Sequence, residues 1–288
     1  MSIYTPNNCK PLSESKVEQQ IRLGIQGYPG TGKTWAALTF PNPVVANLDR
    51  GLAAHDKRAD VIEVPLYNPQ WIRETMRLPA YHPSGLKDIC IKWLETEATK
   101  LTPEQTLVWD GNTGLQNAYH KWYEANQTLF LTKQGNVNEF AEWTVKKKFF
   151  SEIMEIFKSL SCHVVYCCHE IDMKDKNGVN GPLYSGKIRP LLTGAFGDEI
   201  EGHFNNWFRA HAADKPADFT SLKADSVMKM WGMTIDEFRK FCDTFPRGTI
   251  YYWQTESDSV FDAKCSLVNF PRYVPARYET FSKYKRIS

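Results

Sequence analysis

The residues best suited to chemistry lie near the start of the chain, in the run GYPGTGKT at positions 27–34. Its spacing, G-x-x-x-x-G-K-[ST], is typical of a P-loop, the Gly-rich turn that binds nucleotide phosphates. Glycines allow such a loop to turn its backbone N–H groups inward around a phosphate. The lysine supplies charge to the β- and γ-phosphates, and the next hydroxyl reaches Mg²⁺. We expect nucleotide contacts from Gly27, Tyr28, Pro29, Gly30, Thr31, Gly32, Lys33 and Thr34.

The segments on either side of this run predict the elements that would hold it. Residues 21–26 alternate apolar side chains with polar residues or glycine, which predicts a short strand. Residues 34–40 (TWAALTF) suit a helix, which Pro41 and Pro43 would end. A strand, a Gly-rich loop and a helix in this order form the context that a P-loop requires.

A carboxylate that ends a later apolar segment is the second candidate. Residues 106–110 read TLVWD, a compact apolar strand that closes on Asp110. After a P-loop, such a strand is typical of a Walker B segment, whose aspartate holds a water of the Mg²⁺ shell. We therefore expect Thr34 and Asp110 to form the metal site; the alternative for Asp110 is a structural turn.

Two more polar residues follow predicted strands. Asp49 comes directly after residues 44–48 (VVANL), and His169 ends residues 162–169 (CHVVYCCH). Because α/β proteins place ligands at the carboxyl ends of parallel strands, both could lie near the phosphates. Asp49 would orient or activate water and His169 would sense the γ-phosphate; a solvated turn and a buried core histidine are the alternatives. The expected catalytic residues are Lys33, Asp49, Asp110 and His169.

The cysteines and histidines of residues 162–169 also raise the question of a zinc site. Successive side chains of a strand point to opposite faces, so these residues would not converge on one ion. We therefore expect a buried strand here and no metal site.

Residues 171–190 combine two Asp, four Lys or Arg and three Gly. A mobile loop at the edge of the sheet that carries the active site could couple a bound ligand to hydrolysis. The alternative is an ordinary hairpin over residues 174–189. Its basic residues are Lys174, Lys176, Lys187 and Arg189.

The rest of the chain predicts the elements of an α/β fold. Apolar runs predict strands at 61–64 and 204–212 and a hairpin of 250–255 with 263–268. Helices are expected at 69–77, 86–100, 137–160, 224–230 and 235–241. Residues 271–288 hold five Lys or Arg against one Glu, with aromatic residues between them, which suits a DNA groove or a neighbouring subunit.

Composition limits the classes of function. With 288 residues, 42% of them hydrophobic, the chain can form one large α/β domain or one domain with an appendage. A net charge of +2 is too small for a strongly basic nucleic-acid binder, so any such surface must be local. Seven cysteines without a CxxC pair predict reduced thiols and a cytoplasmic protein, and no run predicts a signal peptide or a membrane span. We expect an arm at 1–20, a core at 21–270 with a helical insertion at 213–249, and a basic, aromatic tail at 271–288.

The order of these motifs resembles that of a known family. With the P-loop, a strand-end carboxylate, LVWDGNT, CCHE and GKIRPLLTG in succession, residues 20–275 are similar to phage-encoded AAA/RecA-like ATPases, in particular the Sak-type recombination proteins. The resemblance implies a RecA-like α/β core, a mainly parallel sheet in which an inserted strand separates the P-loop and Walker B strands. It also implies Mg²⁺-dependent ATP hydrolysis, homo-oligomers with ATP at subunit interfaces, and a role in phage-type recombination, annealing or replication in the host cytoplasm.

The same resemblance suggests partners and further site residues. Single-stranded DNA is the partner it implies, together with phage single-strand-binding or replication proteins. In the family the position of Asp49 usually holds a glutamate that activates water, so a shorter carboxylate stands here. Lys264, in FDAKCSL, resembles the lysine that RecA-like subunits extend toward a neighbour's ATP. Contacts to DNA would come from Lys174, Lys176, Lys187 and Arg189.

Other functions share the P-loop. A protein remodeller, such as a helicase loader or packaging factor, would use the same ATP chemistry without a response to DNA. A small-molecule kinase usually needs a lid rich in arginines, and residues 112–160 hold no arginine cluster. A subunit that binds nucleotide and hydrolyses it weakly also fits a chain with Asp49. Stimulation of ATP hydrolysis by DNA, weakened by salt, would distinguish a recombination ATPase from a protein remodeller.

Overall fold

The computed structural model describes residues 20–48, 52, 55, 58–77, 85–172, 187–192, 196–217, 222–231, 233–245, 248–267 and 269–282. The strands are β1 (Arg22–Gly27), β2 (Pro43–Asn47), β3 (Ile62–Pro65), β4 (Thr106–Asp110), β5 (His163–Asp172), β6 (Ile188–Pro190), β7 (Asn206–Asp214), β8 (Thr249–Gln254) and β9 (Tyr273–Pro275). The α-helices are α1 (Lys33–Ala37), α2 (Pro69–Thr75), α3 (Leu86–Thr96), α4 (Asn112–Ala125), α5 (Glu139–Ser159), α6 (Phe196–Glu199), α7 (Leu222–Trp231), α8 (Ile235–Asp243) and α9 (Glu279–Ser282).

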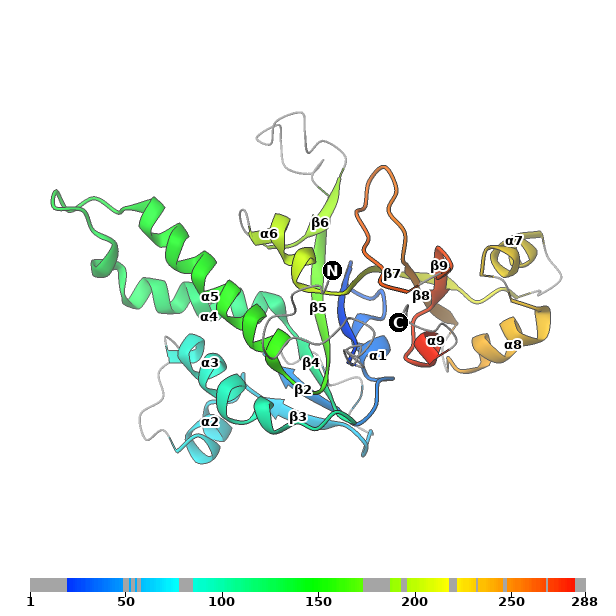
Figure 1. The fold of residues 1–288 in the computed structure, drawn as a ribbon, viewed down its shortest axis with the longest axis horizontal. Helices are drawn as coiled ribbons and strands as arrows, with labels where there is room; N and C mark the ends of the chain where they lie inside the picture. The colour runs from blue at the N-terminus through cyan, green and yellow to red at the C-terminus, as the bar shows by residue number, and fades with distance from the viewer. Residues whose placement is uncertain are drawn as a thin grey trace, which may run out of the picture.

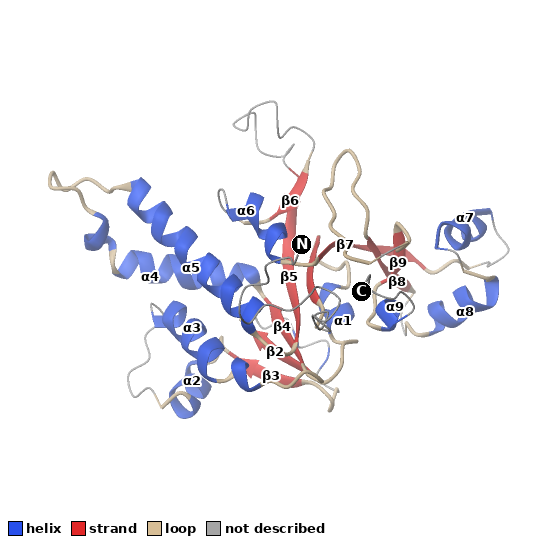
Figure 2. Ribbon diagram, viewed as in Figure 1, coloured by secondary structure: helices blue, strands red, loops and turns tan. Residues whose placement is uncertain are grey.

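One mixed sheet joins the strands in the order β3-β2-β4-β5-β1-β7-β8-β9, and β6 pairs with β5 beside this path. The pairs from β3 to β7 are parallel, whereas β7-β8, β8-β9 and β5-β6 are antiparallel. Helices flank this sheet, which confirms the predicted α/β class (Figure 2). Strand β5 lies between β1 and β4, so a strand separates the P-loop strand from the Walker B strand, as a RecA-like core requires.

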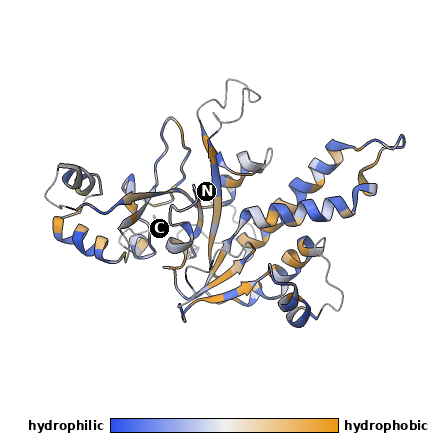
Figure 3. Ribbon diagram, turned by 180° about the vertical axis from the view of Figure 1, so that it is seen from behind, coloured by the Kyte–Doolittle hydropathy of each residue, from blue (hydrophilic) through white to orange (hydrophobic). Residues whose placement is uncertain are grey.

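Alternate residues of the central strands enter two cores on opposite faces of the sheet. Helices α3, α4 and α5 cover one face, where Trp109 and Tyr166 pack against Phe157 of α5. On the other face, Val108 and Val165 pack with α1 and α9. These strands are strongly hydrophobic in Figure 3, as expected where helices cover both faces of a parallel sheet.

Two long helices project from this body. Helices α4 and α5 run side by side and extend well away from the sheet (Figure 1). Near the sheet, Tyr119 of α4 stacks on Phe149 of α5, which joins the two helices. Among the helices of the described residues, none has both the length and the apolar character needed to span a membrane.

The C-terminal part differs from the sequence expectation in two ways. Strand β8 pairs with β7 and β9, not with residues 263–268, and Lys264 forms an isolated bridge to Trp207 instead. The segment expected as a tail adds β9 and α9 to the sheet and its core. Phe281 is buried against Phe40 and Phe208, because aromatic side chains here gain more from burial than from exposure.

The two helices predicted at 224–230 and 235–241 are present as α7 and α8, which lie together at the β8 end of the molecule (Figure 1). A capping box starts α8, since Thr234 accepts from the Glu237 N–H and Glu237 accepts from the Thr234 N–H. Trp231 packs edge-on against Phe238 and Phe241 in a small core of their own. This core continues into β8, so the insertion is fastened to the sheet.

A close approach of backbone and side chain determines the identity of Gly24 on β1. A Cβ at this position would lie 1.9 Å from the indole of Trp207 on the adjacent β7. The indole is fully buried, and its Nε1 donates to Gln26 Oε1 at 3.0 Å. Gly24 therefore provides the space that lets β7 pair with β1 at this register.

We expect Gly24→Ala to lower the free energy of unfolding by about 2 kcal/mol, because overpacking a filled site typically costs about that much. Urea unfolding followed by circular dichroism measures the change. The control is Gly202→Ala, where an added Cβ meets no atom within 4 Å. Equal stability of the two variants would contradict the close approach.

Candidate functional site

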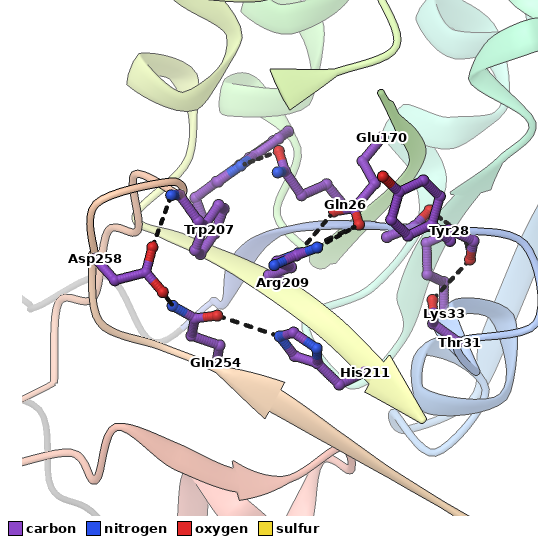
Figure 4. Close-up of polar contacts among 12 residues, drawn as sticks. Gln26, Tyr28, Thr31, Lys33, Glu170, Trp207, Arg209, His211, Gln254 and Asp258 are labelled. Carbon is purple, nitrogen blue, oxygen red and sulfur yellow. Dashed lines mark hydrogen bonds and ion pairs between the residues drawn. The ribbon is translucent and has the colours of Figure 1, made fainter. Parts of the chain in front are cut away.

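The P-loop connects β1 directly to α1, as the sequence predicted. Gly27 is the last residue of β1 and Lys33 is the first residue of α1. Lys33 Nζ donates to the carbonyl oxygens of Gly27 at 2.8 Å and Tyr28 at 2.9 Å. Thr31 Oγ1 also donates to the Tyr28 carbonyl, at 2.8 Å (Figure 4). The lysine side chain therefore crosses the loop that it is expected to share with phosphates.

The strand order brings two more predicted residues to this loop. Gly27 pairs with His169 across β1 and β5, and Asp110 ends β4 on the other side of β5. His169 Nδ1 lies 3.5 Å from Lys33 Nζ. Thr34 Oγ1 donates to Asp110 Oδ2 at 2.7 Å. Residues from three separate segments of the sequence thus meet at the carboxyl edge of the parallel sheet.

Thr34 and Asp110 have the chemistry of a Mg²⁺ site. Mg²⁺ takes hard oxygen ligands, keeps several waters, and is often shared between one or two protein oxygens and substrate phosphates. A hydroxyl and a carboxylate that already touch, both half-buried beside the P-loop, fit that requirement.

Burial determines the electrostatics of Lys33. Its side chain is 7% exposed, and this burial lowers the pKa of the ammonium, while Cys167, Cys168 and Asp110 act in the opposite direction. Two carbonyl oxygens and His169 Nδ1 contact the ammonium, and these polar groups carry no formal negative charge when the imidazole ring is neutral. A phosphate group would supply that charge, and charge-assisted hydrogen bonds are stronger than neutral ones.

A cavity of about 510 Å³ lies beside these residues. Among its described lining residues, Asp110 is the one carboxylate. The P-loop and the predicted strand ends form one part of the wall. Another group of lining residues was not predicted from the sequence: Trp35, His55, Arg58, Asn112, Phe245, Thr249 and Tyr251.

The aromatic residues of β8 are a sequence pattern that could have indicated this group. The same pattern is equally typical of a strand in a protein core. In the structure, Tyr251 of β8 lies against the P-loop. A Cβ at Gly32 would come within 2.3 Å of its ring. Gly32 also has a backbone φ of 78°, which residues other than glycine rarely adopt. Gly32 is therefore required both by its backbone angle and by the tyrosine beside it.

The residue after the Walker B turn links the cavity to β6. Asn112 accepts a hydrogen bond from the Tyr166 hydroxyl and donates to the Leu191 carbonyl at 3.5 Å. Gln116 donates to the same carbonyl at 2.8 Å. Leu191 N–H in turn donates to the His169 carbonyl at 2.6 Å. The end of β5, the start of α4 and the residue after β6 therefore form one connected unit.

An ion pair adjoins His169 on β5. Glu170 is 5% exposed and accepts three hydrogen bonds from Arg209 of β7: Nε donates to Oε1 at 3.2 Å and to Oε2 at 3.0 Å, and Nη2 donates to Oε1 at 2.9 Å. Figure 4 shows the two side chains facing each other across β1. Such bidentate pairs fix geometry as well as charge. The pair joins β5 to β7 next to His169.

The remaining predicted site residues lie outside the cavity or outside the described residues. Lys264 is exposed, and its backbone bridges to Trp207. Lys187 pairs with Asp262 at 2.8 Å, and Arg189 lies in β6 opposite Ile171, so the base of the expected hairpin is present. Asp49, Lys174 and Lys176 lie outside the described residues.

The fold and this edge of the sheet define a P-loop nucleotide-binding α/β protein. A family model described as an AAA domain matches residues 19–264, and the chain belongs to this family. The crystal structure of the RadB recombinase is similar at 11% identity, with a TM-score of 0.31, 84% of this chain covered and 90% of that chain. None of the curated proteins compared with the chain matches it.

We expect Glu170→Gln to lower the free energy of unfolding by about 3 kcal/mol, because it leaves the Arg209 guanidinium largely buried without its counter-charge. The double variant Glu170→Leu, Arg209→Met should recover most of that loss, since both charges are gone. Chemical denaturation of the two variants measures this. A double variant no more stable than Glu170→Gln would argue against a coupled pair.

Proposed function

We propose that the protein hydrolyses ATP in a Mg²⁺-dependent reaction. The observation that carries the proposal is the meeting of Lys33, Thr34 and Asp110 at one edge, with Thr34 Oγ1 2.7 Å from Asp110 Oδ2. Mg²⁺ held by Thr34 and Asp110 would neutralise charge on the β- and γ-phosphates. Membership of the AAA domain family supports a nucleotide-binding ATPase as the class.

Catalysis at such a site depends on positioning and charge stabilisation. Lys33 Nζ would exchange its contacts with the Gly27 and Tyr28 carbonyls for phosphate oxygens, and the loop N–H groups would hold the triphosphate. Asp49 would orient the attacking water. His169, 3.5 Å from Lys33 Nζ, would respond to the γ-phosphate. Because the His169 carbonyl accepts from Leu191, a movement of this strand end would reach β6.

We expect Lys33→Ala to bind ATP poorly and to show no measurable ATP hydrolysis, because the phosphates lose their cation. Steady-state phosphate release with Mg²⁺ measures turnover. The control is Lys100→Ala, which removes an exposed lysine on a surface turn. Ordinary turnover by Lys33→Ala would exclude the P-loop as the site of hydrolysis.

We further propose single-stranded DNA as the effector, in recombination, annealing or replication of the phage type. The support is the position of Lys187 and Arg189, which lie beside and within β6. Strand β6 pairs with the part of β5 that follows His169. A ligand held there would lie two residues from the Leu191 contact to His169. A homo-oligomer would place the exposed Lys264 within reach of a neighbouring subunit's ATP, as the family resemblance implies.

We expect single-stranded DNA to raise the ATPase rate. We expect this stimulation to fall as salt increases, because binding releases counterions from the DNA phosphates and this release is less favourable at high salt concentration. Arg189→Ala should lower the ratio of stimulated to unstimulated rates, and exposed Lys147→Ala on α5 serves as the control. Hydrolysis that is indifferent to DNA at every salt concentration would favour a protein-remodelling role instead.

A further inference from the structure

Three aromatic side chains occupy the part of the cavity wall that the phosphate chemistry does not use. Trp35 follows Thr34 in α1, Phe245 lies just after α8, and Tyr251 lies in β8. The ring centroids of Trp35 and Phe245 are 4.5 Å apart, those of Trp35 and Tyr251 are 5.8 Å apart, and those of Phe245 and Tyr251 are 5.5 Å apart. They form one continuous aromatic wall.

This wall adjoins the P-loop. Trp35 is separated from Lys33 by one residue in the same helix, and Tyr251 lies against Gly32. All three aromatic residues line the same cavity as Lys33, Thr34 and Asp110. The cavity therefore joins a cationic, oxygen-rich part with an aromatic part, which matches the two chemical halves of a nucleoside triphosphate.

Side chains of α7 and α8 pack against the wall on the side away from the cavity, which favours the same ring positions with and without a ligand. Phe245 is 2% exposed and packs edge-on against Phe241 of α8 at 5.0 Å, and Phe241 packs on Trp231 of α7. Trp35 and Tyr251 are only half-buried. Rings that are fixed by packing and still partly exposed lose little entropy when another ring stacks on them.

We propose that Tyr251 and Trp35, supported by Phe245, form the platform on which the base of the bound nucleotide stacks. Aromatic side chains recognise bases through the π-face that every base has, and this contact adds affinity without contacting the phosphates. The inference rests on the proposed function for the triphosphate half of the ligand. It also assigns a role to the α7–α8 insertion, whose packed core supports the platform.

The test compares two probes, ATP and inorganic triphosphate, by calorimetric titration in the presence of Mg²⁺. We expect Tyr251→Leu to weaken ATP binding about tenfold, equivalent to about 1.4 kcal/mol, and to leave binding of inorganic triphosphate unchanged. Tyr251→Phe keeps the ring and should bind ATP within about twofold of the native protein. Tyr123→Leu is the matched control, because this half-buried tyrosine lies in α4, packs against Phe130 and does not line the cavity.

The outcomes distinguish failure of the base platform from failure of the proposed phosphate site. Unchanged ATP affinity in Tyr251→Leu, or equal losses for both probes, would overturn the base platform and leave the phosphate site intact. So would native protein that binds ATP no more tightly than inorganic triphosphate. Native protein that binds neither probe would overturn the proposed nucleotide site and the platform with it. If Tyr251→Leu does not fold, Trp35→Leu is measured against the same two probes, with the same expected result.

Discussion

A buried ammonium group, that of Lys33, lies where three parallel strands end, and much of the structure serves to hold it there. Its direct acceptors are two backbone carbonyls of the P-loop, and burial lowers its pKa. A cation in such a place is costly to the fold unless an anion joins it. The parallel registers of β4, β5 and β1 provide the surroundings for that anion, because they align Asp110, His169 and the loop at one edge.

The neighbouring contacts join the strands at that edge to one another and link the edge to β6. Trp207 fills the space over Gly24, and the Glu170–Arg209 pair spans from β5 to β7, so the strands on both sides of β1 are fixed to each other. Leu191, the residue after β6, donates a hydrogen bond to the His169 carbonyl and accepts one from Asn112. A change in the phosphate site therefore has a short covalent and hydrogen-bonded route to a charged surface strand.

Local patterns in the sequence predicted the parts of this site that depend on neighbours in the chain. The P-loop follows β1 and Asp110 ends β4, as the patterns indicated. His169 lies within β5, which continues to Asp172 because its last residues pair with β6, so the predicted strand end at His169 was wrong. The inserted strand between β1 and β4 came from family resemblance, since a pattern of apolar residues does not fix strand order. Long-range pairing explains the misses. The partner of β8 is β7, whose position depends on the space at Gly24, and Phe281 is buried because α9 returns to the sheet. Tyr251 joins the cavity for the same reason, and its local sequence is equally typical of a core strand.

A crystal structure of the protein with a non-hydrolysable ATP analogue, and with Mn²⁺ in place of Mg²⁺, would show whether the P-loop binds the nucleotide. Anomalous scattering from Mn²⁺ locates the metal independently of the nucleotide. We expect the triphosphate within the P-loop in contact with Lys33, and the metal beside Thr34 Oγ1 with Asp110 in its coordination shell. Nucleotide bound elsewhere on the molecule, or a metal site away from both Thr34 and Asp110, would contradict the proposed site.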